Sequence, residues 1–285
     1  MPYKNSHIKG WVRVLFVIIA YLFVGNVFKL IGVVVAGIDM YTQFNQATIL
    51  QLLTVTFFDF IGIVAVLFLF LKIIDKESFI GIGLCLRNRS VDILIGILIG
   101  FFTMSLGILA LISIDAISYK GVNLDLYELC YMFFLYIIVA LKEELLYRAY
   151  ILRNLMYSFN KYKALLISAV LFALMHSMNS NLSVLTFINI FLGGIMLGLP
   201  YMLNKNLWFP ITLHFSWNFF QSLFGVNAGD APYSLFVFQK SGSGMINIGE
   251  SYFEQPLLFT LMYMVLIIAI YIWYRKKQAS THATE

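Results

Sequence analysis

The stretch "LYELCYMFFLYIIVALKEELLYRAYI", from Leu126 to Ile151, joins a long apolar run to the charged side chains Glu143, Glu144 and Arg148. An apolar run of about 20 residues is long enough for a helix to cross a bilayer. A carboxylate inside such a helix costs roughly 3 kcal/mol or more, unless it is paired, hydrated or protonated. The stretch therefore predicts a membrane helix whose charges need a structural or a chemical explanation.

The composition extends this prediction to the whole chain. Hydrophobic residues make up 61% of the 285 residues and charged residues only 12%, about half the charged fraction of a typical soluble domain. No series of short alternating segments indicates a membrane barrel. We predict an all-α polytopic membrane protein with about eight transmembrane helices around an internal polar cavity. The expected spans are Trp11–Ala36, Ala47–Ile73, Val91–Ile112, Leu126–Ile151 with an extension to Tyr157, Ala164–His176, Leu182–Leu203, Leu207–Phe224 and Pro256–Tyr274.

Basic residues alternate between the connections in the way that the positive-inside rule describes. Connections expected inside carry most of the lysines and arginines, whereas those expected outside carry only Lys120 and Lys240. We therefore expect a multi-pass protein of the cell membrane with both termini in the cytoplasm. The net charge of +5 follows from this topology and does not indicate a nucleic-acid partner. Abundant Ile, Asn and Lys point to a low-GC bacterium.

Several polar side chains in the apolar runs could carry chemistry. Glu144 and Arg148 are four residues apart and share a helical face, so we expect them to form an ion pair. Glu143 points about 100° away and has no partner in its own helix. Two of the four histidines, His176 and His214, also lie in apolar runs, and Asn218 follows His214 by four residues. Such groups can activate a water molecule and stabilise an oxyanion.

Glu143 and His176 can meet only with particular helix boundaries. If the fourth helix runs from about Tyr131 to Tyr157 and the fifth begins near Leu165, both residues fall near the middle of the membrane. The polar segment "SMNSN" after the fifth helix would then line a water-filled cavity, because exposed polar backbone is not tolerated in lipid. We expect this second set of boundaries.

Asp59 is a further charge in the middle of an apolar run. It could belong to the cavity or pair with Lys29, and we favour a structural role. Lys29 lies near the outer end of its helix, where its long side chain can extend to the membrane surface. Cys85 and Cys130 are far apart in sequence and predict neither a disulfide nor a metal site.

Three motifs resemble those of the CPBP family of intramembrane proteases, also called the Abi family, which includes CAAX prenyl proteases and bacteriocin-processing or immunity proteins. The EExxxR motif begins at Glu143, the FxxxH motif spans Phe172 to His176, and the HxxxN motif spans His214 to Asn218. The resemblance implies about eight helices around a conical cavity. It divides the chain into N-terminal helices (1–125), a catalytic core (126–224) and an external loop with a C-terminal helix (225–285).

The resemblance also implies roles for the motif residues. Glu143 would be the general base, Glu144 and Arg148 the structural pair, and His176 a residue that holds the water. His214 and Asn218 would stabilise the oxyanion. The substrate would be a peptide or membrane protein in the bilayer, and in a low-GC bacterium peptide maturation or bacteriocin immunity suits it better than prenylated CAAX proteins. The sequence gives no indication of an oligomeric state.

Two other functions use the same residues differently. A non-catalytic immunity or scaffold protein could keep the motifs for folding. A proton-coupled transporter could use Glu143 and the histidines as a relay, but such transporters show internal symmetry, which this sequence lacks.

We expect no cofactor, with zinc as the alternative. Glu143, His176 and His214 could form a zinc site, but the sequence lacks HExxH. Using Glu143 as a ligand would also remove the base.

Overall fold

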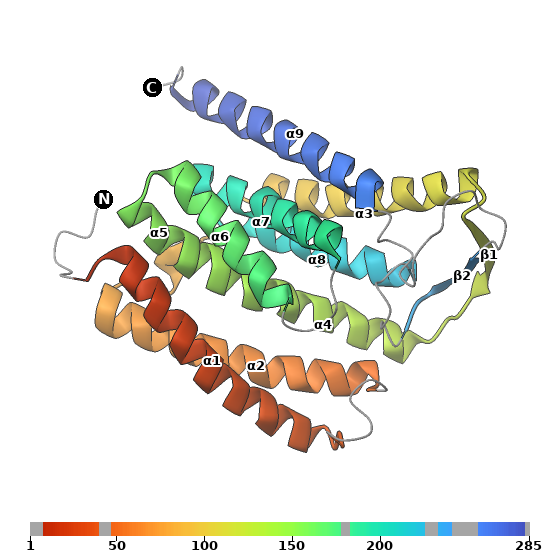
Figure 1. Cartoon of the computed structure of the whole chain (residues 1–285), viewed down its shortest axis with the longest axis horizontal. Helices are drawn as coiled ribbons and strands as arrows, with labels where there is room; N and C mark the ends of the chain where they lie inside the picture. The colour runs from red at the N-terminus through yellow and green to blue at the C-terminus, as the bar shows by residue number, and fades with distance from the viewer. Residues whose placement is uncertain (1–7, 40–46, 178–182, 226–232, 241–255, 283–285) are drawn as a thin grey trace.

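The computed structural model describes residues 8–39, 47–177, 183–225, 233–240 and 256–282. Its long helices run along the long axis of the molecule (Figure 1). The first helix begins and the last helix ends at the same end of the bundle, opposite a small β-sheet (Figure 1). Both ends of the described chain therefore lie on one side, as the expected topology requires.

Each expected span corresponds to a helix. The long helices are α1 (Gly10–Val35), α2 (Ile49–Phe70), α3 (Ser90–Ser113), α4 (Leu126–Glu144), α6 (Lys161–Ser177), α7 (Val184–Asn204), α8 (Trp208–Leu223) and α9 (Pro256–His282). Shorter turns are the π-helix η2 (Leu71–Asp75), the 3₁₀-helix η3 (Ile80–Ile82), the π-helix η4 (Leu145–Leu152) and the helix α5 (Arg153–Ser158).

Among the described residues, five helices are long and apolar enough to cross a membrane by themselves. These are Gly10–Val35, Ile49–Asp75, Ser90–Ser113, Val184–Asn204 and Phe259–Ala279. The others fall short because α6 and α8 have 17 and 16 residues, and because α4 ends in the charged motif. The polytopic α-helical fold is therefore supported, and the count of eight crossings stays a prediction.

The fourth helix is longer than the apolar run that indicated it. Helix α4 continues through η4 into α5, so the chain stays helical from Leu126 to Ser158. The expected extension to Tyr157 is confirmed, and α6 begins at Lys161, slightly before the expected Leu165. The π-helical turns of η4 are wholly buried. Such turns are rare in proteins and are common at functional sites.

One part of the fold prediction is wrong, because the chain also contains a two-stranded antiparallel sheet. Strand β1 (Ile117–Val122) follows α3 and pairs with β2 (Phe236–Lys240), with Ile117 opposite Lys240 and Val122 opposite Phe236. The pairing provides hydrogen-bond partners for backbone N–H and C=O groups in two connections that are far apart in sequence. The connection expected at Val226–Gln255 thus contains a strand, while its residues 226–232 and 241–255 lie outside the described part.

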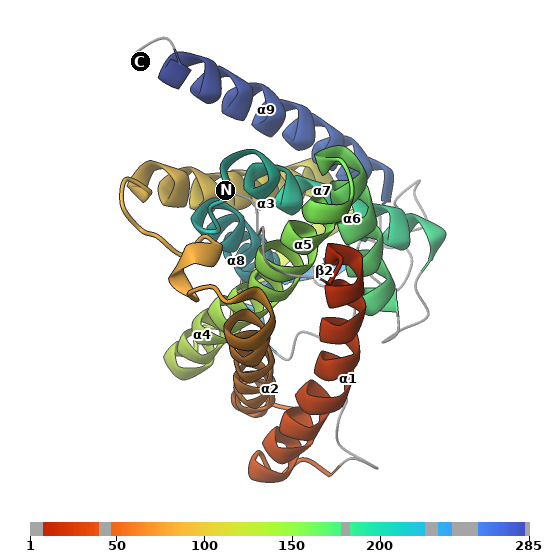
Figure 2. The same ribbon diagram turned by 90° about the vertical axis from the view of Figure 1, so that its left-hand side faces the viewer.

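Helices α1 and α9 lie on opposite sides of the bundle in both views (Figures 1 and 2). Both expose large apolar side chains, such as Phe23, Val34 and Val265, each at least 65% exposed. Apolar surface of this kind suits contact with lipid. Helix α1 packs on α2, α3 packs on α8, and α7 packs on α6 and α9. The motif-bearing helices α4, α6 and α8 lie between these outer elements.

Basic side chains gather at the end that carries the termini. Four ion pairs between described residues form there, joining Arg13 to Asp75, Arg153 to Glu77, and both Arg89 and Lys277 to Asp92. Lys120 and Lys240, which we expected outside, both lie on the sheet at the opposite end. The two ends of the bundle thus differ in charge, as the positive-inside rule predicts. By that rule, the basic end faces the cytoplasm.

Candidate active site

Glu144 is fully buried and holds two partners with a single oxygen atom. Its Oε1 accepts a hydrogen bond from Arg148 Nη1 at 2.9 Å, which confirms the expected pair. The same atom accepts a hydrogen bond from His214 Nδ1 at 2.8 Å. This second contact joins α4 to α8 and orients the imidazole.

Arg148 has further contacts that compensate its buried charge. Its Nη2 donates to the backbone oxygen of Gly194 on α7 at 3.3 Å. The centre of its guanidinium lies 4.6 Å from the centroid of the Phe172 ring on α6, within the range of a cation–π contact. The EExxxR motif therefore contacts both α6 and α8, the helices that carry the other two motifs.

Glu143 faces both motif histidines. Its Oε2 lies 3.6 Å from Nε2 of His176 and 3.8 Å from Nε2 of His214. Oε2 is buried and has no hydrogen-bond partner among the described residues. Both separations are slightly too long for a direct hydrogen bond. The free glutamate and the two histidines, predicted from three separate runs, meet at one point.

The partners of the histidines determine which ring nitrogens carry hydrogen. His176 Nδ1 lies 2.8 Å from the backbone oxygen of Phe172, which can only accept, so Nδ1 donates. His214 Nδ1 likewise donates to the Glu144 carboxylate. In the neutral state each Nε2 therefore presents a lone pair toward Glu143. Three acceptor atoms therefore face one another in the site, Oε2 of Glu143 and Nε2 of each histidine.

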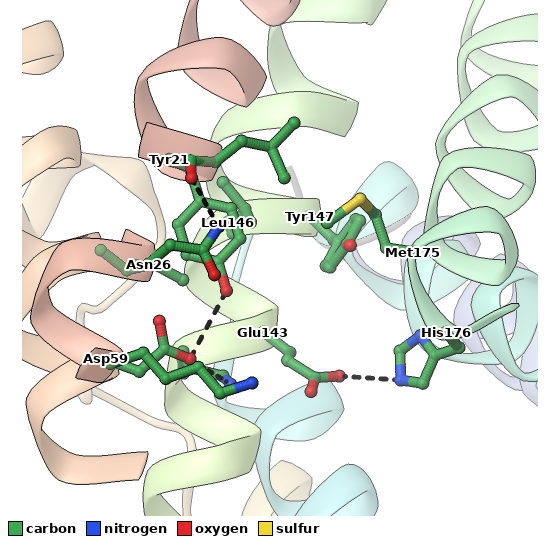
Figure 3. A pocket seen from close by; sticks show the side chains of 12 residues that line it. Tyr21, Asn26, Asp59, Glu143, Leu146, Tyr147, Met175 and His176 are labelled. Carbon is green, nitrogen blue, oxygen red and sulfur yellow. Dashed lines mark hydrogen bonds and ion pairs between the residues drawn. The ribbon is translucent and has the colours of Figure 1, made fainter. Parts of the chain in front are cut away.

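A cavity of about 210 Å³ opens beside Glu143 between α1, α2, α4 and α6. Figure 3 shows Glu143 between Asp59 and His176, with Tyr147 and Met175 on the neighbouring wall. Polar and apolar groups share the lining, which suits a peptide with both kinds of group. The expected internal polar cavity is present next to the free glutamate.

Asp59 lines the same cavity, but its partner differs from the expected one. Its Oδ2 lies 2.8 Å from Lys142 Nζ and accepts a longer hydrogen bond, 3.5 Å, from the Tyr21 hydroxyl. Lys29 lines the cavity without pairing with Asp59. Lys142 stands beside Glu143 in the sequence, yet nothing in the spacing links it to Asp59 on α2. Sequence reasoning therefore missed Lys142 and Tyr21 as parts of the site.

One family model matches the part of the chain that carries the motifs. Residues 125–220 match the family model described as type II CAAX prenyl endopeptidase Rce1-like. This segment is similar to that family. It begins at the N-cap of α4 and ends within α8, so it contains all three motifs. The match agrees with the resemblance to the CPBP proteases. The five long apolar helices support a multi-pass membrane protein. No curated protein and no solved structure gives a significant match to the chain.

Asn218 lies within the Rce1-like segment, one turn after His214 on α8, and is half-buried. We find no hydrogen bond to its side chain among the described residues, so its expected role stays a prediction. The polar segment "SMNSN" begins at Ser177, the last residue of α6. The rest of it, residues 178–182, lies outside the described part of the chain.

The described side chains offer no preformed metal site. Across residues 8–39, 47–177, 183–225, 233–240 and 256–282, no group of three His, Cys, Asp or Glu side chains is arranged to hold a metal ion. Glu144 is occupied by Arg148 and His214.

Proposed function

We propose that the protein is an intramembrane endopeptidase that hydrolyses a peptide bond in a membrane-associated peptide or protein. The observation that carries this proposal is the position of Glu143 Oε2, unpartnered and facing Nε2 of both His176 and His214. The match to the type II CAAX prenyl endopeptidases supports the reaction class. Because that match covers residues 125–220 alone, we leave the sequence of the substrate open.

In the proposed reaction, Glu143 takes a proton from a water molecule in the site. The oxygen of that water attacks the carbonyl carbon of the scissile bond at the same time. His176 holds the water through Nε2. The negative oxygen that forms on the substrate then needs hydrogen-bond donors. The C–N bond breaks as Glu143 returns the proton to the leaving amine.

His214 and Asn218 are the proposed donors to this oxygen. Nδ1 of His214 already donates to Glu144, so Nε2 can donate only when the ring is protonated. The amide of Asn218 donates without a change of charge.

We infer that the water is activated without a metal ion. Zinc lowers the pKa of a bound water, but the hydrolysis still needs a group to move protons. In this site Glu143 is the free carboxylate, and Glu144 is held by two partners. Purified protein should therefore keep its activity after prolonged treatment with a strong chelator. Activity that is lost on chelation and restored by added zinc would make Glu143 a ligand.

The decisive experiment compares Glu143→Gln with Glu128→Gln. Both variants replace one carboxylate of α4 by an amide, but Glu128 lies in the first turn, far from the site. We expect Glu143→Gln to abolish cleavage, because an amide cannot accept the proton, and Glu128→Gln to cleave normally. Comparing the membrane peptides of cells with each variant would also reveal the substrate. Near-normal cleavage by Glu143→Gln would show that Glu143 is not the base. A cellular function that survives in Glu143→Gln, without cleavage by the wild-type protein, would favour a non-catalytic scaffold.

A further inference from the structure

A second cavity, of about 530 Å³, lies at the basic end of the bundle and shares no residue with the candidate active site. It is formed where α3 begins, α7 ends and α9 approaches its C-terminus. Its lining residues are Arg87, Asn88, Arg89, Leu203, Asn204, Lys205, Tyr274, Lys277 and Gln278. Four of these side chains are cationic and none is acidic.

The charge of this cavity is only partly compensated. Asp92, which is buried, pairs with Arg89 at 2.9 Å and with Lys277 at 2.8 Å. Arg87 and Lys205 form no ion pair with any described residue. The Nε atom of Arg89 is buried and has no hydrogen-bond acceptor among those residues. One carboxylate beside four cations leaves an excess of positive charge. Arg89 Nε remains a buried donor without an acceptor among the described residues.

Lys205 is a lining cation whose positive charge is disfavoured by its surroundings. Burial, together with the neighbouring charges of Arg153 and Lys161, lowers the pKa of Lys205 to about 8. Its Nζ contacts the Met156 sulfur at 3.0 Å, a weak acceptor that leaves the positive charge uncompensated. A bound anion would reverse this effect, since an opposite charge favours the protonated lysine.

The surroundings of the cavity indicate an anion that is attached to lipid. On α3, Val91 and Leu94 are 59% and 56% exposed in the turns next to the cavity. On α9, Ile268 and Ile272 also expose apolar side chains just before it. We propose that this cavity binds the phosphate of an anionic phospholipid, whose acyl chains lie along the apolar surfaces of α3 and α9. Basic pockets between helix ends are suited to such headgroups.

The proposal can be tested on the purified full chain by native mass spectrometry. The protein, in an uncharged detergent, would be given equal amounts of phosphatidylglycerol and phosphatidylcholine. We expect preferential retention of phosphatidylglycerol. The double variant Arg87→Ala/Lys205→Ala should weaken that binding by roughly fivefold for each cation removed. Lys163→Ala is the matched control, because Lys163 is an exposed cation at the same end that does not line the cavity.

Three results would overturn the proposal. The first is equal retention of the two lipids by the wild-type protein. The second is undiminished phosphatidylglycerol binding by the double variant, or an equal loss in Lys163→Ala. The third is displacement of phosphatidylglycerol by an equal concentration of inorganic phosphate, which would show that the cavity takes the free anion. Thermal unfolding of each variant in the same detergent separates lost binding from lost folding.

Discussion

The two neighbouring glutamates differ because their side chains point to different partners. Glu144 pairs with Arg148 and His214 through Oε1, whereas Glu143 lines the cavity and forms no hydrogen bond through Oε2. Replacing Glu144 by Gln would leave the Arg148 charge buried without a counter-ion. Breaking one side of a buried pair typically costs about 3 kcal/mol or more.

We therefore expect Glu144→Gln to lower the unfolding temperature and the folded yield, while Glu143→Gln should unfold close to the wild-type temperature. Thermal unfolding in detergent measures both. Replacing the pair by apolar residues, in Glu144→Leu/Arg148→Met, should recover part of the loss. An unfolding temperature of Glu144→Gln equal to that of the wild type would mean that Arg148 does not depend on this carboxylate.

Asn218 is expected to act in the reaction and not in folding. It is half-buried and forms no hydrogen bond with the described residues, so its removal should leave the bundle intact. Loss of one donor to an oxyanion typically lowers turnover by about 10² to 10³. We expect Asn218→Ala to show this decrease in kcat with little change in KM. Normal turnover at saturation combined with weak binding would instead assign Asn218 to substrate holding.

At the scale of single residues, the sequence predicted contacts within a helix better than contacts between helices. The spacing of Glu144 and Arg148 was sufficient to predict their pair, because residues four apart share a helical face. The contact of His214 with Glu144, and that of Lys142 with Asp59, join segments separated by about 70 and 83 residues. Such contacts depend on how whole helices rotate and pack, and spacing carries no information about that.

At the scale of elements, the position of α8 depends on its close approach to α3. Gly96 and Gly100 lie four residues apart on α3, and small residues at this spacing let helix backbones approach in membranes. The Ser216 hydroxyl of α8 donates to the Gly96 oxygen at 3.0 Å. A Cβ atom at Gly100 would lie 2.7 Å from the Ser216 Cβ atom and 2.8 Å from its carbonyl carbon. The sequence contains this signal in "GILIG", which our sequence analysis did not use.

We expect Gly100→Ala to push α8 away from α3. Overpacking of this kind costs about 1 to 3 kcal/mol, and the displaced helix carries His214 and Asn218. Turnover and unfolding temperature should therefore both fall. Gly193→Ala is the matched control, because the nearest atom to its Cβ would be a Tyr263 ring carbon at 3.5 Å. Equal behaviour of the two variants would show that α3 and α8 can separate without consequence.

The helices were predictable and the sheet was not, for a physical reason. Apolar runs of membrane length mark a helix, because a lipid-facing backbone must satisfy its own hydrogen bonds. Strands β1 and β2 are short, lie in connections and depend on each other across more than a hundred residues. The π-helical turns of η4 also escaped prediction. They change how the backbone is wound within one continuous helix, which the apolar pattern does not reveal.

At the scale of the whole molecule, the orientation in the membrane determines from which side substrate and lipid reach the two cavities. The basic end carries the termini of the described chain and the second cavity, and the sheet lies at the other end (Figure 1). The positive-inside rule assigns the basic end to the cytoplasm. If so, the phospholipid proposed for the second cavity belongs to the cytoplasmic leaflet, where anionic lipids create a negative surface potential.

This orientation can be tested with single thiols at the two ends. Cys85 and Cys130 are both free, so Cys130→Ser leaves Cys85 in the connection between η3 and α3 at the basic end. Lys120→Cys, in a chain without both native cysteines, places one exposed thiol on β1. A membrane-impermeant maleimide should label Lys120→Cys in intact cells and label Cys85 only after the membrane is permeabilised. The opposite pattern would reverse the orientation and place the second cavity at the outer surface.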